Sequence, residues 1–208
     1  MARLFAGRRK FFVIVPLSCV LVLVAGGLLL IRILSTSADL SFEGAINGRL
    51  TQESDSRGII RTCFLGKGQW NWSFEGLLNG RRVEASIVVT PYHGPGTYTY
   101  EGILDSQTLE QLRQSQFYQG NVPVYMVVAM GPLDALGVTQ YRSYPGAAYR
   151  AIPLSELTKF APLGRLSVVL NQDEKSGRVT GLLMSTAGPT AAPLHVSGSF
   201  GCGLLHRG

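Results

Sequence analysis

Cysteine and histidine are the residue types in this 208-residue chain best suited to catalysis or metal binding, and the chain contains three of each. A cysteine acts as a nucleophile in its thiolate form and needs a neighbouring base. The histidine nearest before Cys202 is His195. Because residues seven apart on one strand point to opposite faces of a sheet, a strand at this end of the chain would keep the two side chains apart.

The segment Ser199-Phe200-Gly201-Cys202 faintly resembles the Ser-His-Gly-Cys motif of L,D-transpeptidases, a family of exported enzymes. Phe200 stands where that motif has histidine, and Leu204 stands where it has a basic or polar residue. The His93-Gly94 pair lies far upstream of the spacing typical of the family. The resemblance therefore does not predict a cysteine nucleophile of this kind.

Metal and cofactor sites are not predicted. His93, His195 and His206 have no histidine or cysteine partner at ligand spacing, and no run of alternating carboxylates is present. Ser199 lacks the Gly-x-Ser-x-Gly elbow, and no glycine-rich phosphate-binding motif follows a predicted strand. We expect neither a metal nor a cofactor.

A long connection between two predicted strands, from Gly131 to Arg165, is the best candidate for a binding surface. Tyrosine and arginine, which are enriched at recognition surfaces, are its notable residues. The candidate binding residues are Tyr141, Arg142, Tyr144, Tyr149 and Arg150. The alternative is that the tyrosines pack the loop onto a sheet and the arginines are solvated, with Pro153 to Phe160 forming a small covering helix.

The N-terminal part predicts a membrane anchor. Arg8-Arg9-Lys10 is followed by an apolar run from Phe11 to Ile31 that has no charge until Arg32. As a helix this run is about 31 Å long, which matches the hydrocarbon core of a bilayer. Basic residues concentrate before the run, so the N-terminus is expected in the cytoplasm and the rest outside. The predicted parts are a cytoplasmic tail (1–10), a transmembrane anchor in the lipid bilayer (11–34) and an extracytoplasmic domain (35–208).

Two other interpretations of this segment are open. Thr36-Ser37-Ala38 has the small residues of a signal-peptide cleavage site, although the apolar run is longer than a typical signal peptide requires. Cys19 follows Leu17-Ser18 as a lipidated cysteine would, but Pro16 stands where a lipobox has leucine. An uncleaved anchor agrees best with the length of the run.

The formal net charge of +6 does not indicate nucleic-acid binding. Five of the 19 basic residues flank the apolar run, which leaves 14 basic against 13 acidic residues elsewhere. The exported part contains no basic run that would follow phosphates. The charge is instead typical of an anchor beside the anionic inner leaflet.

Cys63 and Cys202 are the two cysteines outside the predicted anchor, in a compartment expected to be oxidising. We predict that they form a disulfide. Two free buried thiols are the alternative.

The exported part predicts a mainly β fold. Apolar and polar residues alternate in Trp70 to Glu75, Val83 to Thr90, Leu166 to Leu170 and His195 to Phe200, whereas Val124 to Met130 is apolar almost throughout, as in a strand covered on both faces. Roughly nine strands are expected. They suit an antiparallel two-layer β-sandwich or a closed barrel, of which we favour the sandwich. A short helix is expected at Ser106 to Gln114.

A local repeat predicts two hairpins. Ser41-Phe42-Glu43-Gly44-Ala45-Ile46-Asn47-Gly48-Arg49 is echoed by Ser73-Phe74-Glu75-Gly76-Leu77-Leu78-Asn79-Gly80-Arg81. Asn-Gly accepts the positive φ angles of a type I′ turn, so each copy is expected to form strand, tight turn and strand.

The segments Tyr92 to Tyr98, Ser176 to Val179 and His195 to Cys202 resemble a loose group of exported or anchored bacterial envelope β-sandwich proteins, with the mycobacterial 19 kDa lipoprotein antigen as a distant comparison. The resemblance implies the fold and the envelope location, not an activity. Our own hypothesis is a binding or structural module of the cell envelope with a protein or glycan partner. The alternative is an envelope hydrolase or transferase whose site is assembled from distant residues such as His93, Asp105 and Cys202.

Overall fold

The computed structural model places two units in the chain, Met1–Ser35 and Thr36–Gly208. It describes residues 36–51, 61–102, 122–131, 138–144, 149, 152–160, 163–203 and 205–208. The predicted tail and anchor, and the predicted helix at 106–114, lie outside the described residues. Within the described part, no helix has the length and apolar character of a membrane span.

Strands dominate the described part, so the predicted mainly β fold is confirmed. The twelve strands described are β1 (Ser37–Gly44), β2 (Gly48–Thr51), β3 (Arg61–Gly66), β4 (Gln69–Leu78), β5 (Arg81–Val89), β6 (Gly96–Tyr100), β7 (Val124–Ala129), β8 (Gln140–Arg142), β9 (Arg165–Leu170), β10 (Ser176–Ser185), β11 (Leu194–Gly201) and β12 (His206–Arg207). Helix α3 (Leu154–Leu157) and the 3₁₀ helix η3 (Thr158–Phe160) lie where the packing alternative for the long connection places a small helix, between Pro153 and Phe160.

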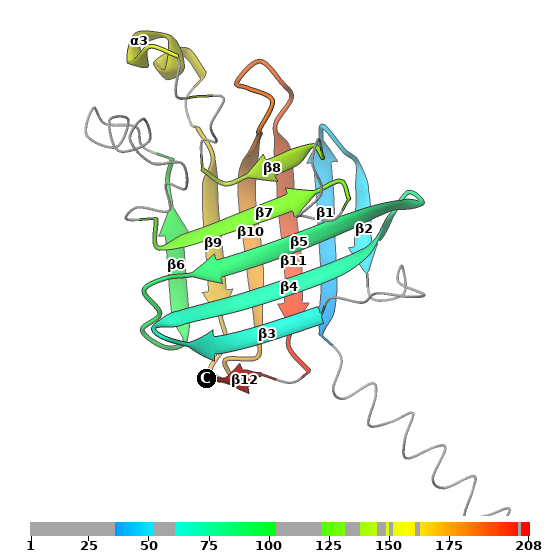
Figure 1. Ribbon diagram of the computed structural model, residues 1–208, viewed down its shortest axis with the longest axis vertical. Helices are drawn as coiled ribbons and strands as arrows, with labels where there is room; N and C mark the ends of the chain where they lie inside the picture. The colour runs from blue at the N-terminus through cyan, green and yellow to red at the C-terminus, as the bar shows by residue number, and fades with distance from the viewer. Residues whose placement is uncertain are drawn as a thin grey trace, which may run out of the picture. The chain divides into compact units, whose positions relative to one another are not determined.

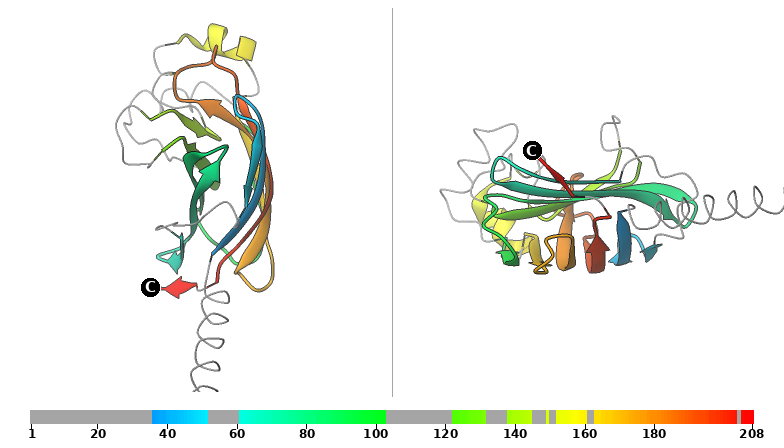
Figure 2. Two further views of the ribbon diagram at one scale, coloured as in Figure 1. Left: turned by 90° about the vertical axis from the view of Figure 1, so that its right-hand side faces the viewer. Right: turned by 90° about the horizontal axis from the view of Figure 1, so that it is seen from below.

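Hydrogen bonds connect these strands in the order β12-β3-β4-β5-β7-β8-β10-β11-β1-β2, and β9 and β6 branch from β10. Strand β10 joins two groups of strands. Its residues 177–182 pair with β9, and Met184 and Ser185 pair with β8. We call β3, β4, β5, β7 and β8 the β4 group, and β1, β2, β6, β9, β10 and β11 the β10 group. The β4 group runs across the β10 group in Figure 1, and Figure 2 shows the groups from the side.

Both groups contribute side chains to the main hydrophobic core. On β4, Trp70, Trp72 and Phe74 are fully buried, as their alternation predicts. Phe200 of β11 meets both tryptophan rings, with centroids 5.6 Å from Trp70 and 5.5 Å from Trp72. A Cβ atom on Gly177 would lie 2.5 Å from the Phe200 ring, so this glycine leaves the space that the ring fills. Such aromatic pairs contribute about 0.5 to 1.5 kcal/mol beyond their buried area.

Strand β7 is covered on both faces, as its continuous apolar sequence predicts. Val124, Met126 and Val128 point into the main core, whereas Tyr125 on the opposite face is also buried. Tyr125 belongs to a second cluster with Val88 of β5.

The two copies of the repeat form different turns. Asn79 and Gly80 have φ angles of 51° and 76° and join Leu78 directly to Arg81, so the predicted two-residue turn is confirmed in the second copy. In the first copy β1 and β2 form the hairpin, but pairing starts at Phe42 and Gly48, and the connection is longer. The prediction of a tight Asn-Gly turn there was therefore wrong.

Tertiary contacts explain the longer first turn. The Asn47 side chain accepts a hydrogen bond from the Gly44 amide at 3.0 Å, and the Ala45 amide donates to the Pro193 carbonyl at 3.0 Å. The Asn79 side-chain amide donates to the Asn47 carbonyl at 2.7 Å, so the repeated turns contact each other. The connection thus bonds to Pro193, the residue before β11, and to the other turn instead of closing in two residues.

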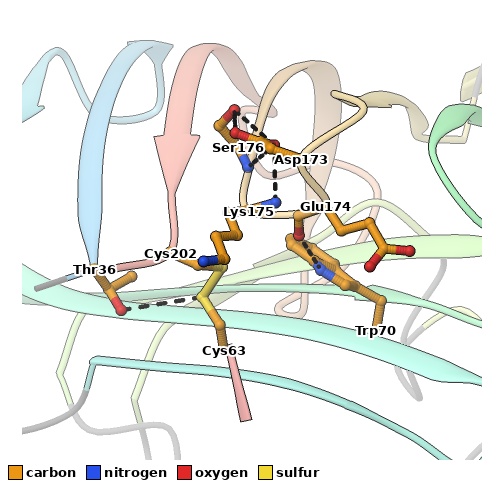
Figure 3. The surroundings of a disulfide bond; sticks show 8 residues. All are labelled: Thr36, Cys63, Trp70, Asp173, Glu174, Lys175, Ser176 and Cys202. Carbon is orange, nitrogen blue, oxygen red and sulfur yellow. Dashed lines mark hydrogen bonds between the residues drawn. A yellow bond between two sulfur atoms is a disulfide. The ribbon is translucent and has the colours of Figure 1, made fainter. Parts of the chain in front are cut away.

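The predicted disulfide between Cys63 and Cys202 is present, with its Cα atoms 5.8 Å apart. It joins β3 to the residue after β11, and Thr36 lies beside it (Figure 3). A sulfur in a disulfide is not a thiolate, so the alternative enzyme built on His93, Asp105 and Cys202 has no nucleophile here. His93 is exposed, and Asp105 lies outside the described residues.

The turn after β9 is bonded to the core and to the C-terminal strand. Trp70 donates its indole hydrogen bond to the Glu174 carbonyl at 3.0 Å. The Glu174 carboxylate accepts from the Tyr92 hydroxyl at 2.8 Å and from Arg207 at 2.5 Å. These two donors lower the pKa of Glu174, the Tyr92 hydroxyl most strongly.

Candidate binding face

The three tyrosines of the predicted binding loop are buried in three different places. Tyr141 in β8 is 7 % exposed and belongs to the main core. Tyr144 is 8 % exposed and packs edge-on against Tyr125, with ring centroids 5.6 Å apart. Tyr149 is 1 % exposed, in a small cluster with Leu157 of α3. The fold therefore separates the rings and directs each into packing.

Tyr149 is the most firmly held of the three. Its hydroxyl donates to the Ser185 carbonyl at 3.1 Å, and burial raises its pKa to about 12. The ring thus fixes the segment before α3 onto the end of β10. These contacts agree with the alternative in which the tyrosines pack the long connection onto a sheet.

The predicted arginines have different outcomes. Arg142 donates to the Gln140 side chain at 2.8 Å, and its guanidinium carbon lies 5.8 Å from the centroid of the Tyr144 ring. Arg150 lies outside the described residues. A shared Tyr and Arg binding surface here stays a prediction, and it would require buried rings to become exposed.

The outer face of the β10 group has a different character, because its central residues carry hydroxyl groups. Cross-strand pairing places one hydroxyl residue opposite the next through five neighbouring strands. In order from β1 to β6, they are Ser41, Ser197, Thr180, Ser167 and Thr99. With strands about 4.8 Å apart, this hydroxyl row extends about 19 Å across the sheet.

The row points outward because alternate residues of the same strands fill the core. Leu40 and Phe42 flank Ser41 and are buried, as are Leu166 and Val168 on either side of Ser167. Thr99, Thr180 and Ser197 are exposed, and the other two row residues are half-buried. Among the described residues, none of the five hydroxyls forms a side-chain hydrogen bond, so each offers one donor and two acceptor positions.

Two adjoining hollows share the β1 end of this row. The larger, about 460 Å³, is lined by Glu43, Glu101, Arg165 and His195, in addition to row residues. The smaller, about 340 Å³, adds Asp39, Arg49 and Arg178. Ser41, Thr180 and Ser197 line both hollows. The hydroxyls therefore form a common floor, and charged side chains stand on either side of it.

Opposite charges balance on this face. The two hollows are lined by three carboxylates and three guanidinium groups. Arg49 donates to both carboxylate oxygens of Asp39, at 2.6 Å and 2.7 Å, and this contact lowers the pKa of Asp39. Glu43 and His195 are direct cross-strand neighbours. The face is thus polar without a net charge of its own.

This arrangement suits hydrogen bonding to a ligand better than covalent chemistry. Within the described residues, no cluster of histidine, cysteine and carboxylate side chains could hold a metal ion. No family model, curated protein or solved structure matches this chain. The function must therefore be inferred from the chemistry of the face itself.

The sequence contained part of the signal for this face. Alternation already places His195, Ser197 and Ser199 on one side of their strand. The row was missed because its members come from five segments whose order in the sheet the sequence does not give. These polar positions form one surface only because the strands pair in a register that sets Ser41 opposite Ser197 and Ser197 opposite Thr180.

Proposed function

We propose that this protein is a single-pass envelope protein whose exported domain, an antiparallel two-layer β-sandwich, binds an envelope component through the hydroxyl row and its two hollows. The apolar run after Arg8-Arg9-Lys10 supports an anchor with the N-terminus in the cytoplasm. The disulfide supports an oxidising compartment for the rest. The crossing strand groups with a shared core support the sandwich.

The hydroxyl row is the observation that carries the binding function. Five hydroxyls without side-chain partners in the described part of the chain lie in register over five strands. A solvent-facing sheet surface needs only polar side chains, and these can be charged as well as hydroxyl-bearing. A row of one chemical type on the floor of two hollows instead offers repeated, equivalent hydrogen-bonding positions to a ligand.

Capture of isolated envelope material tests this proposal. Full-length protein in detergent should sediment with washed cell envelopes, and T180Y combined with S197Y should reduce the captured fraction by about ten-fold or more. Tyrosine is favourable in strands, and both positions are exposed, so the variant should keep its fold.

The control is L77Y, because Leu77 is an exposed strand residue on the β4 group, away from the row. It should leave capture unchanged. Equal capture by the parent protein and the row variant, at equal thermal stability, would refute a binding role for this face.

A further inference from the structure

The hydroxyl row also specifies the class of ligand. Resting on the proposed binding function, we infer that the face binds an uncharged, extended glycan chain that lies along the row, across the strands. Four features of the face support this inference: its hydrogen-bonding chemistry, its shape, the pairing of its strands and its charge balance.

The hydrogen-bonding chemistry matches that of a sugar. Serine and threonine hydroxyls donate one hydrogen bond and accept two, and sugar hydroxyls have the same dual capacity. A ligand that only accepts, such as a phosphate polymer, is recognised by clusters of arginine and lysine. The residues that line both hollows are Ser41, Ser197 and Thr180. It can therefore pair with a ligand that both donates and accepts along its length.

The shape of the face matches a chain and not a compact molecule. The row is continuous through five strands and spans about 19 Å at the usual strand spacing. The two hollows lie on opposite sides of the row, the larger toward Glu43 and His195 and the smaller toward Asp39 and Ser199, and they share three row residues. Residues of β1, β11, β10 and β9 line the larger hollow, so it extends along the row. An extended polymer can follow the row and reach the hollow on either side, whereas a single small ring would contact only part of the row.

The backbone pairing of the β10 group excludes an extended peptide as the ligand at the centre of the face. A peptide strand binds by adding to an unpaired sheet edge. Strands β9, β10 and β11 each have partners on both sides, so the centre of the face has no edge. A ligand here must contact side chains, which is how a glycan would bind.

The charge balance indicates a neutral ligand. Charged ligands are attracted by surfaces of one opposite sign. Here three carboxylates and three guanidiniums line the two hollows, and Asp39 is already paired with Arg49. The charged groups are thus placed to make hydrogen bonds with sugar hydroxyls beside the row. They do not favour a ligand of either charge.

Calorimetric titration of the full-length protein in detergent tests the inference. The probe is a soluble linear hexasaccharide of β-1,4-linked N-acetylglucosamine, and polygalacturonate is the anionic comparison. The neutral probe should bind with an affinity that is insensitive to ionic strength, since no charge is neutralised. T180V combined with S197A removes two opposite hydroxyls with little change in volume and should weaken binding by about ten-fold.

The matched control is S73A combined with S86A. Ser73 and Ser86 are also cross-strand neighbours, on β4 and β5, and are half-buried. This pair should leave the affinity unchanged. Thermal unfolding of both double variants verifies that the fold is retained.

The possible failures separate this inference from the proposed function. If the neutral probe does not bind, or if polygalacturonate binds instead with steep salt dependence, the glycan inference is wrong. In either case, envelope capture that still depends on Thr180 and Ser197 leaves the binding function standing. Loss of that dependence as well would overturn both proposals.

Discussion

At the scale of single residues, exposure decides which aromatic side chains can recognise a partner. Tyrosine near arginine is the composition of many interfaces, and the same rings also suit packing. Tyr149 is 1 % exposed and its hydroxyl is satisfied by the Ser185 carbonyl. By contrast, Ser197 and Thr180 are exposed and free of side-chain partners in the described part of the chain. Small hydroxyl residues are therefore better placed than tyrosines to meet a ligand.

Replacing Tyr149 tests this assignment. We expect Y149A to reduce the free energy of unfolding by about 3 to 5 kcal/mol, because a fully buried ring leaves a cavity. Y149F keeps the ring and loses one hydrogen bond, so it should cost only about 1 kcal/mol. Chemical denaturation of the two variants measures the difference. A Y149A protein that unfolds like the parent but no longer captures envelopes would instead make Tyr149 a recognition residue.

At the scale of elements, local pattern predicts strands and some turns. The alternation around Trp70, Trp72 and Phe74 and the two-residue turn at Asn79-Gly80 are both present. The same dipeptide at Asn47-Gly48 forms a longer connection because Ala45 bonds to Pro193 of a distant segment. A turn that depends on tertiary partners cannot be predicted from its own residues.

Two glycines illustrate how neighbouring strands constrain an element. Gly80 has a φ of 76° in an open turn, where a Cβ atom would have no described heavy atom within 4 Å apart from its chain neighbours. Gly198 in β11 has a φ of 151°, and a Cβ atom there would lie 2.0 Å from the Asp39 carbonyl oxygen of β1. Gly80 is needed only for its positive φ angle. Gly198 is needed for its positive φ angle and also for the close approach of β1 to β11.

Alanine at these two positions should therefore have unequal effects. G80A should cost about 1 to 2 kcal/mol, the usual penalty of left-handed backbone for a residue with a Cβ atom. G198A should cost clearly more, since strands β1 and β11 must also separate. Urea denaturation compares the two variants. Equal losses would show that β1 does not lie as close to β11 as described.

At the scale of the whole molecule, strand order creates the candidate face. The five row residues are separated by unequal stretches of sequence, so no spacing rule could group them. The order β6-β9-β10-β11-β1 and its register align them. The mainly β character and the Cys63–Cys202 pairing could be predicted, because alternation and cysteine count do not depend on that order. The face could not, since it is a property of the assembled sheet.

The proposed membrane topology makes a prediction for each end of the chain. If the basic tail holds the N-terminus in the cytoplasm, protease added to spheroplasts should digest the C-terminal domain and leave a tag on the N-terminus protected. Cys63 and Cys202 should then resist thiol-reactive reagents until they are reduced. Protection of the C-terminal domain from external protease would contradict the topology.

Changing the basic tail gives a sharper form of this prediction. Replacing Arg8, Arg9 and Lys10 by glutamine, and adding lysines after Arg32, should reverse the orientation and leave the domain in a reducing compartment. The bridge closes a sequence separation of 139 residues, so its absence should cost about 5 kcal/mol by chain entropy. The reversed protein should therefore have free thiols and much faster proteolysis. C63A combined with C202A in the original orientation is the control, since it should lose the same stability without any change in topology.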